Sequence, residues 1–410
     1  MNTLRFITAG NVDDGKSTLI GRLLYDSDSI HTDQLGVLQK QTKQEGVDID
    51  LSLITDGLRA EREQGITIDV AYKYFSTSKR KFIIADAPGH EQYTRNMITG
   101  ASNSDLIIVL VDARNGITDQ TKRHASVGSL MGIKKAIIAI NKIDLLNYSE
   151  EVFNQIKNDF EAIKSELNYN EIIYIPVSAL VGDNVVTTSE NTPWYNGKSI
   201  LQTLESVELD GTEDLEARFQ VQWVIRPKDE DNHDYRGYAG QILSGSYKVG
   251  DKVTILPAKI ETTLVKIEKD LKEVSEVVAG DNVVLHFEND IDISRGDTVV
   301  LSHQLPKEDN QINTWISWLD NNSLQVGKTY LLQHRFKNVR VKVQQINRKW
   351  NVNQWQFTDG DVVQLNDIAQ VTLKTSQPLY YDTFEKNPKS GSAILIDETS
   401  FNTVGALMFL

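Results

Sequence analysis

Apolar runs and helical patterns alternate along the first half of the chain. Six runs predict strands near Leu4–Ala9, Thr67–Phe75, Lys81–Asp86, Asp105–Asp112, Ala136–Asn141 and Ile172–Val177. Helical stretches such as Ser17–Tyr25 lie between them. Strands that alternate with helices favour a mostly parallel sheet with helices on both faces. The pattern therefore predicts an α/β domain over residues 1–209, with the loops at the strands' carboxyl ends converging on one edge.

After residue 209 this alternation stops. The acidic segment 208–214 has the composition of a linker, and short apolar runs separated by glycine turns follow it. They predict strands near Arg218–Ile225, Gly237–Leu243, Gly245–Tyr247, Lys252–Leu256, Thr262–Ile267 and Asp281–Phe287, and then near Asn313–Trp318, Lys328–Arg335, Val339–Ile346, Asp367–Leu373 and Ser392–Asp397. This spacing predicts two all-β barrel domains, over residues 213–305 and 307–410.

A glycine-containing segment after the first predicted strand carries the strongest chemical signal. It fits the pattern G-x-x-x-x-G-K-[ST] and runs Gly10-Asn11-Val12-Asp13-Asp14-Gly15-Lys16-Ser17, followed by Thr18. The glycines let backbone N–H groups close around phosphates, and the start of a helix adds partial positive charge. Lys16 is placed to reach the β- and γ-phosphates, and the Ser17 hydroxyl to ligate Mg²⁺. The alternative is a chance glycine turn, and three further motifs in the expected order argue against it.

Those three motifs indicate which nucleotide binds. They are Asp86-Ala87-Pro88-Gly89-His90, Asn141-Lys142-Ile143-Asp144 and Ser178-Ala179-Leu180, each directly after an apolar strand. Asp86 can hold Mg²⁺ through a water, and the Gly89 amide can bond the γ-phosphate. The Asp144 carboxylate can accept hydrogen bonds from the guanine ring N–H and from the exocyclic amino group, which adenine lacks. A backbone donor in the 178–180 loop suits the guanine O6, so the sequence predicts a GTP site.

Composition narrows the function classes. The chain has 43 Lys and Arg against 57 Asp and Glu, a net charge of −14, which argues against binding nucleic acid through its phosphates. Four cations between Arg335 and Lys342 are interpreted as a solvated strand face, with a binding patch as the alternative. No apolar run approaches the ~18 residues of a membrane span. Cysteine is absent, which excludes disulfides and thiolate zinc sites. We expect a cytoplasmic protein without membrane contact.

The polar segment before the second predicted strand ends in A-E-R-E-Q-G-I-T-I-D, residues 60–69. Here and at D-A-P-G-H the chain resembles the translational GTPases related to elongation factor Tu, in which these segments are switch I and switch II. The resemblance implies that Thr67 adds a hydroxyl to Mg²⁺ and its amide to the γ-phosphate in the GTP state. It also implies that His90 orients the attacking water and that two barrels follow the GTPase domain. The alternative is that residues 61–64 are a solvated helix face and His90 a surface histidine.

Further segments point away from translation. Asp14 stands where elongation factors commonly carry histidine. The chain resembles the family of GTPase subunits of sulfate adenylyltransferase in Asp26-Ser27, in residues 86–97, 112–116, 119–124 and 193–195, and in Arg226-Pro227 with residues 235–240. The charged stretch 228–234 departs from that family's pattern.

This second resemblance implies what the chain works with. The partner would be a separate catalytic ATP-sulfurylase subunit, GTP would be the substrate and GDP the product, and Mg²⁺ the cofactor. Hydrolysis of GTP would drive the synthesis of adenylylsulfate from ATP and sulfate by that partner. The alternative function is an elongation factor that delivers aminoacyl-tRNA.

Overall fold

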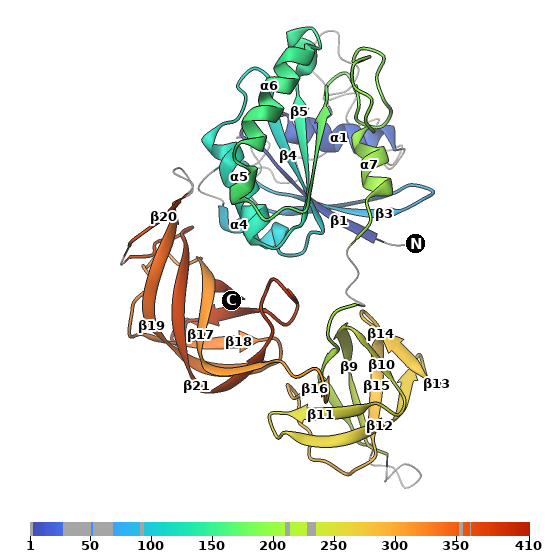
Figure 1. The fold of residues 1–410 in the computed structure, drawn as a ribbon, viewed down its shortest axis with the longest axis vertical. Coiled ribbons are helices and arrows are strands. Elements are labelled where there is room, and N and C mark those ends of the chain that lie inside the picture. The colour runs from blue at the N-terminus through green and yellow to red at the C-terminus, as the bar shows by residue number, and fades with distance from the viewer. Residues whose placement is uncertain are drawn as a thin grey trace. The chain divides into compact units, whose positions relative to one another are not determined.

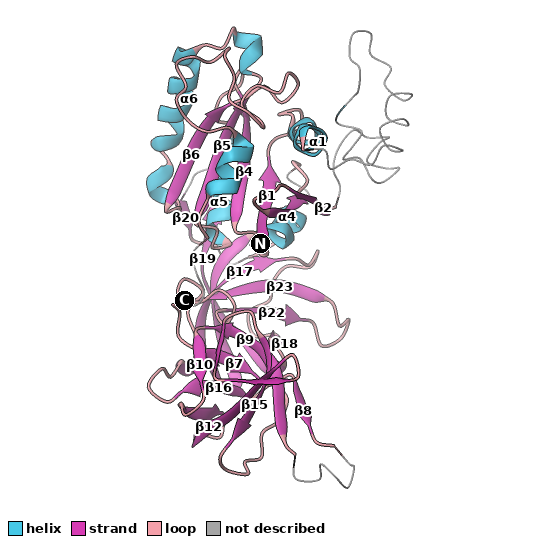
Figure 2. Cartoon of the chain, turned by 90° about the vertical axis from the view of Figure 1, so that its right-hand side faces the viewer, coloured by secondary structure: helices cyan, strands magenta, loops and turns pink. Residues whose placement is uncertain are grey.

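The computed structural model describes residues 3–27, 51, 69–90, 94–209, 214–227, 235–351, 356–360 and 362–410. It divides into two compact units (Figure 1). One is built on Met1–Leu209, and the other on Asp210–Asn351 with Gln356–Leu410. Within the described residues, the first unit holds all the helices and the second consists of strands and loops (Figure 2).

A six-stranded sheet forms the centre of the first unit. Its strands are β1 (Thr3–Ala9), β2 (Ala71–Ser76), β3 (Lys81–Asp86), β4 (Leu106–Asp112), β5 (Lys135–Asn141) and β6 (Glu171–Pro176), in the spatial order β2-β3-β1-β4-β5-β6. Neighbouring strands from β3 to β6 are parallel, and β2 alone runs antiparallel. The mostly parallel sheet is therefore confirmed. Strand β2 begins later than predicted, because Ala71 already pairs with Asp86, the last residue of β3.

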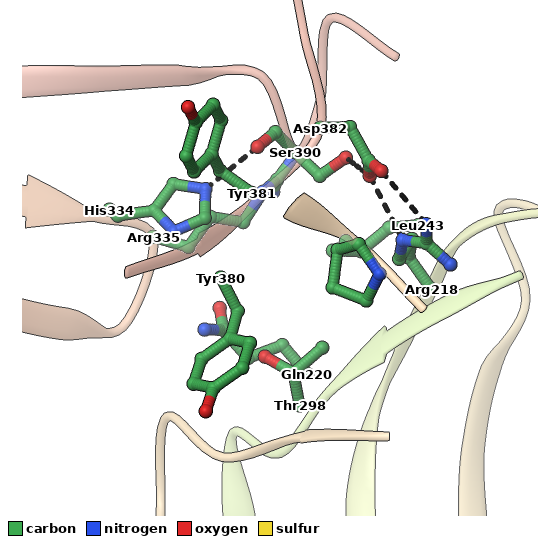
Figure 3. Close-up of a pocket in the computed structure, with 11 residues that line it drawn as sticks. Arg218, Gln220, Leu243, Thr298, His334, Arg335, Tyr380, Tyr381, Asp382 and Ser390 are labelled. Carbon is green, nitrogen blue, oxygen red and sulfur yellow. Dashed lines mark hydrogen bonds and ion pairs between the residues drawn. The ribbon is translucent and has the colours of Figure 1, made fainter. Parts of the chain in front are cut away.

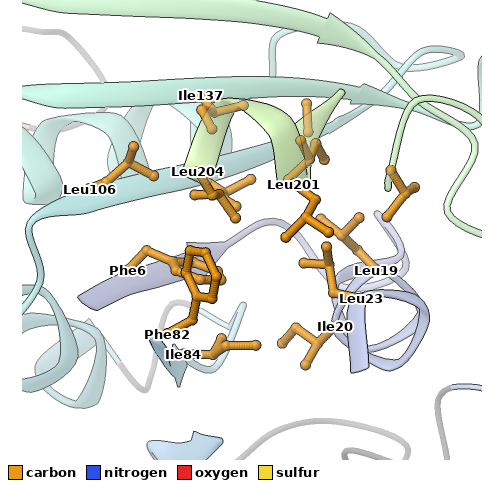
Figure 4. Close-up of a cluster of buried hydrophobic side chains, with 14 of the residues drawn as sticks. Phe6, Leu19, Ile20, Leu23, Phe82, Ile84, Leu106, Ile137, Leu201 and Leu204 are labelled. Atoms are coloured by element: carbon orange, nitrogen blue, oxygen red, sulfur yellow. The ribbon is translucent and has the colours of Figure 1, made fainter. Parts of the chain in front are cut away.

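Helices cover both faces of this sheet. They are α1 (Lys16–Asp26), α4 (Thr94–Ala101), α5 (Asp119–Leu130), α6 (Glu150–Glu161) and α7 (Ile200–Ser206), with the 3₁₀ turns η3 (Ile143–Leu146) and η4 (Lys164–Glu166). Alternate residues of a strand point to opposite faces. Phe6 of β1 therefore packs in a cluster with Leu19 of α1 and Leu204 of α7 (Figure 4), whereas Ile7 faces Gly100 of α4. This packing fixes the strand ends from which the predicted motifs extend.

The first barrel is a sheet closed on itself by the pairing of β11 with β12. The closed sheet contains β7 (Arg218–Gln220), β8 (Trp223–Ile225), β9 (Gly237–Ser244), β11 (Lys252–Leu256), β12 (Ile260–Lys269), β13 (Lys272–Val274), β15 (Asn282–Phe287) and β16 (Thr298–Leu301). Two further strands, β10 (Ser246–Lys248) and β14 (Glu276–Val278), pair with each other in a separate two-stranded sheet. The single strand predicted over 218–225 is two strands. It divides because β7 pairs with both β16 and β9, whereas β8 pairs with β9 alone.

The second barrel closes through the pairing of β18 with β19. Its strands are β17 (Lys307–Trp318), β18 (Thr329–His334), β19 (Lys337–Asn351), β20 (Gln356–Thr358), β21 (Ile368–Tyr381), β22 (Ser392–Ile396) and β23 (Thr403–Phe409). Each barrel has its own cluster of buried apolar side chains. The two-barrel prediction is therefore confirmed in kind, and its boundaries stay a prediction.

A buried ion pair joins the two barrels within the second unit (Figure 3). The Arg218 Nε and Nη2 atoms donate to the two carboxylate oxygens of Asp382 at 2.9 and 2.8 Å. Nearby, the Arg335 Nε atom donates to the Lys389 carbonyl oxygen at 2.7 Å. Arg340 and Lys342 are exposed on β19 and alternate with buried valines, which is the pattern of a solvated strand face. Arg340 pairs there with Glu398 at 2.8 Å, whereas Arg335 precedes the strand.

No helix in the described ranges has both the length and the apolar character needed to cross a membrane.

Candidate functional site

The loop between β1 and α1 is shaped by its own turn. The Asn11 N–H donates to the Asp14 carboxylate at 2.8 Å, and the Asp14 N–H donates to the Asn11 carbonyl at 3.2 Å. Gly15 has a φ of 91°, which favours glycine, and it precedes α1 without a side-chain hydrogen bond at the helix cap. No side chain at the cap accepts a hydrogen bond from the first N–H groups of α1. Backbone donors in such a position can bind an anion.

The structure brings Lys16 and Asp86 together across 70 residues of sequence. Lys16 is the first residue of α1 and Asp86 the last residue of β3, and their side chains form an ion pair while only 8% and 2% exposed. A buried charge without a partner is strongly destabilising, so each of these groups holds the other in place. The predicted phosphate lysine and the predicted Mg²⁺ aspartate thus lie in contact.

Asn141 connects three of the predicted motifs. Its Nδ2 atom donates to the Asp14 carbonyl oxygen at 2.7 Å, and its Oδ1 atom accepts a hydrogen bond from the Ala179 N–H at 3.0 Å. The loop between β1 and α1, which is the predicted phosphate loop (residues 10–17), is therefore tied to the loop after β5 and the loop after β6 at one buried amide.

A charge network lies beside this amide. Lys142 donates to the Asp13 carbonyl oxygen and pairs with Asp112 at 3.0 Å, while Arg114 pairs with the same carboxylate at 2.6 Å. Burial acts to raise the pKa of Asp112, but hydrogen bonds from Arg114 and Lys142 outweigh it and hold the pKa at about 2. Asp112 is the last residue of β4 and lies at the same sheet edge as the motifs. Its place at a strand end could have predicted that it belongs to the site, although the sequence motifs did not include it.

The loop after β3 lies directly against the phosphate loop. A Cβ atom at Gly89 would fall 2.4 Å from the Gly10 carbonyl oxygen, so this approach requires glycine. The Gln120 Nε2 atom of α5 donates to the Gly89 carbonyl at 2.9 Å and lies 2.9 Å from the His124 Nε2 atom. Burial lowers the pKa of His124 to about 3, so the ring is neutral and its Nε2 atom accepts from Gln120. His90, which follows Gly89 in the chain, is exposed.

Most of the predicted site residues lie in the described part of the chain, on loops at one edge of the sheet. Asp144 is half-buried in η3, directly after Lys142 and Ile143. Thr67, the segment 60–68 and the stretch 228–234 lie outside the described residues, so the expectations about them stay predictions. Among the described residues, no three or more His, Cys, Asp or Glu side chains form a cluster that could hold a metal ion.

Comparison with known proteins places the chain in a family. Residues 1–216 match the family model of the elongation factor Tu GTP binding domain, and residues 311–409 match that of the GTP-eEF1A C-terminal domain-like family. Sulfate adenylyltransferase subunit 1 of Alteromonas mediterranea is 47% identical, and the alignment covers 99% of this chain and 86% of that protein. The chain belongs to the sulfate adenylyltransferase subunit 1 family.

Two further relatives match with the same coverage of this chain. Sulfate adenylyltransferase subunit 1 of Teredinibacter turnerae is 48% identical over 99% of this chain and 86% of its own length. The bifunctional enzyme CysN/CysC of Mycobacterium tuberculosis is 46% identical over 99% of this chain and 67% of its own length. The family assignment therefore extends over both barrels as well as the GTP binding domain.

The phosphate loop of this subunit 1 family member contains a carboxyl with a raised pKa. Burial raises the pKa of Asp14 to about 6, against a hydrogen bond from the Asn11 N–H that lowers it, and the charge of Asp112 adds to the increase. Because the folded state holds the proton more tightly, ionising Asp14 lowers stability as pH rises from about 4 to about 6. Above that range the full cost is present.

We predict that Asp14→Asn raises the melting temperature at pH 7 more than at pH 5. The asparagine oxygen still accepts from Asn11, while the buried charge is removed. Thermal unfolding of the nucleotide-free chain at both pH values measures this. Asp13→Asn, which changes an exposed neighbour in the same loop, is the matched control. The charge of Asp13 contributes least to the raised pKa of Asp14, so the difference between the two pH values should be smaller for this variant. Equal shifts for Asp14→Asn would contradict the prediction.

Proposed function

We propose that this chain is the GTP-hydrolysing regulatory subunit of a sulfate adenylyltransferase. In this proposal GTP hydrolysis is coupled to the synthesis of adenylylsulfate from ATP and sulfate by a catalytic ATP-sulfurylase subunit. The supporting observation is that Asn141 ties the phosphate loop to the loops after β5 and β6 in a member of the subunit 1 family. The relatives' name supplies the sulfate reaction and the partner subunit, and the site supplies the GTP chemistry.

The site has a group for each part of the nucleotide. Lys16 and the N–H groups at the start of α1 would bind the β- and γ-phosphates. Asp144 would accept hydrogen bonds from the guanine ring N–H and amino group, which gives preference over adenine. Lys142, held by Asp112 and the Asp13 carbonyl, links the base loop to the phosphate loop.

The described residues fit a Mg²⁺ ion. Mg²⁺ takes oxygen ligands, keeps several waters, and binds one or two protein groups together with substrate phosphates. Ser17 offers a hydroxyl next to Lys16, and Asp86 offers a carboxylate in contact with Lys16, so both oxygens lie beside the proposed phosphate site. Thr67 is the further proposed ligand. When bound, Mg²⁺ would neutralise charge on the phosphate oxygens.

Hydrolysis depends on positioning and on charge neutralisation, because the transition state is loose. Lys16 would stabilise charge on the transferred phosphoryl group, the Gly89 amide would bond it, and His90 would orient the attacking water. Loss of the γ-phosphate would release the loops that hold Thr67 and Gly89, so a partner that touches them senses the nucleotide state. A cytoplasmic location stays a prediction of the sequence.

The guanine site gives the first functional prediction. Asp144→Asn should weaken GTP binding strongly, because the carboxylate's two accepted hydrogen bonds are lost to a group that carries a donor. Xanthosine triphosphate, whose ring presents an acceptor there, should become the better ligand. Titration of the folded variant with both nucleotides measures this, and unchanged GTP affinity would remove Asp144 from the role.

The hydrolysis of GTP gives the second functional prediction. His90→Ala should bind GTP nearly as wild type does but hydrolyse it far more slowly, because the imidazole positions water and does not bind nucleotide. A single-turnover assay with the partner subunit present separates the two steps. Hydrolysis at the wild-type rate would refute the assignment of His90.

The coupling of GTP hydrolysis to adenylylsulfate synthesis gives the third functional prediction. GTP turnover should rise when the partner subunit, ATP and sulfate are present together. The yield of adenylylsulfate should also exceed the yield from ATP and sulfate without GTP. A non-hydrolysable GTP analogue should abolish the extra yield. If the purified pair makes the same amount of adenylylsulfate with and without GTP, the sulfate function is wrong, and stimulation by ribosomes would favour the aminoacyl-tRNA alternative.

A further inference from the structure

Arg22 of α1 contacts the loop that follows β6. Its Nε atom donates to the Ala179 carbonyl oxygen at 3.3 Å, and its Nη2 atom donates to the Leu180 carbonyl oxygen. The side chain is 18% exposed and also lies 3.5 Å from the Asp26 carboxylate, one turn further along α1. Two consecutive carbonyls of one loop are therefore held by a single planar guanidinium, whose donors have a fixed fork geometry.

The turn of this loop lies beside the arginine. Gly182 has a φ of 104°, which favours glycine, and a Cβ atom there would be in ordinary van der Waals contact with the Arg22 Cδ and Nε atoms at 3.7 Å. The Gly182 N–H closes the turn by donating to the Ser178 carbonyl at 2.7 Å. Arg22 therefore contacts a turn that is also closed by its own backbone hydrogen bond.

One backbone donor of the loop stays uncommitted. The N–H groups of Ser178, Ala179, Val181 and Gly182 donate to Asp183, to Asn141, to the Ser178 hydroxyl and to the Ser178 carbonyl. Within residues 178–182, all of them described, the Leu180 N–H is the donor for which no acceptor is present. The backbone donor expected for the guanine O6 is therefore narrowed to Leu180, since the Ala179 N–H is held by Asn141.

Arg22 determines where that donor points. The Ala179 carbonyl and the Leu180 N–H belong to the same trans peptide unit, so they point in opposite directions. Holding the carbonyl towards α1 turns the Leu180 N–H away from α1. Because the second bond, to the Leu180 carbonyl, fixes the next peptide as well, the plane cannot rotate without breaking a contact to Arg22.

We propose that Arg22 is a positioning residue for guanine recognition, which aims the Leu180 N–H at the O6 atom of the base. This inference rests on the proposed GTP function and adds a residue from the phosphate-binding helix to base selection. An arginine that only stabilises the fold would weaken the binding of every nucleotide alike. One that acts through O6 would weaken only the binding of bases that carry that oxygen.

Three diphosphates separate these cases. GDP carries both O6 and the 2-amino group, inosine diphosphate keeps O6 but lacks the amino group, and 6-thio-GDP keeps the amino group but replaces O6 with sulfur, a weak acceptor. We expect Arg22→Gln to weaken GDP and inosine diphosphate by the same factor, about five- to tenfold, the size of one hydrogen bond. Its effect on 6-thio-GDP should be much smaller. Equilibrium titration of the full-length chain measures all three.

Asp26→Asn is the matched control, because it removes a partner of Arg22 and leaves both loop carbonyls in contact. It should bind all three ligands as wild type does. Arg22→Lys keeps the charge but lacks the planar fork, so it should show the same ligand pattern with a smaller effect. This variant serves if thermal unfolding shows that Arg22→Gln does not fold.

Equal weakening for all three ligands, or none for GDP, would overturn the role of Arg22. Failure of the wild-type chain to prefer GDP over ADP would instead overturn the proposed GTP function, so the two failures are distinguishable.

Discussion

The side-chain amide of Asn141 is the constraint on which the site depends. It is 2% exposed, and both of its polar atoms are bonded to backbone atoms, one of Asp14 and one of Ala179. Leaving a buried amide group without its partner costs about 1–3 kcal/mol, so the three loops that meet here are not independent. The same amide requires glycine at position 15, where a Cβ atom would lie 2.4 Å from the Asn141 Nδ2 atom. The loop proposed to hold phosphate and the loop proposed to hold the base therefore share one anchor.

The cations of the site lie against carboxylates at two strand ends. Lys16 contacts Asp86 at the end of β3, and Lys142 and Arg114 both contact Asp112 at the end of β4. In the proposed function, a phosphate that takes Lys16 as its partner frees the Asp86 carboxylate to hold Mg²⁺. Phosphate and metal binding would then support each other. Phosphate on Lys16 leaves Asp86 available for Mg²⁺, and Mg²⁺ on Asp86 leaves Lys16 available for phosphate. A chain with a net charge of −14 can bind a polyanion in this way, since the cations that matter are already fixed in place.

The sequence predicted the parts of the site that follow from strand ends, because a parallel sheet gathers its carboxyl ends at one edge. That geometry places the predicted phosphate loop close to the loops that contain Asp86, Asn141 and Ser178. It could not supply the contacts made by Gln120 or Arg22, since a helix residue that reaches a distant loop leaves no local pattern. Strands β13 and β20, with three residues each, were missed because so few residues show no clear alternation and no glycine turn directly precedes either strand, as Gly245 precedes β10.

The position of Gly89 bears on how a partner could be coupled to hydrolysis. Its backbone lies against the Gly10 carbonyl on one side, and its own carbonyl is held by Gln120 on the other. A packed peptide in this position has no room for small, continuous adjustments, so it either keeps both contacts or leaves them together. His90 follows directly, and helix α4 begins four residues later at Thr94. In the proposed function, a partner that moves the Gly89 peptide would therefore also move His90, the residue proposed to orient the attacking water, through one discrete backbone change.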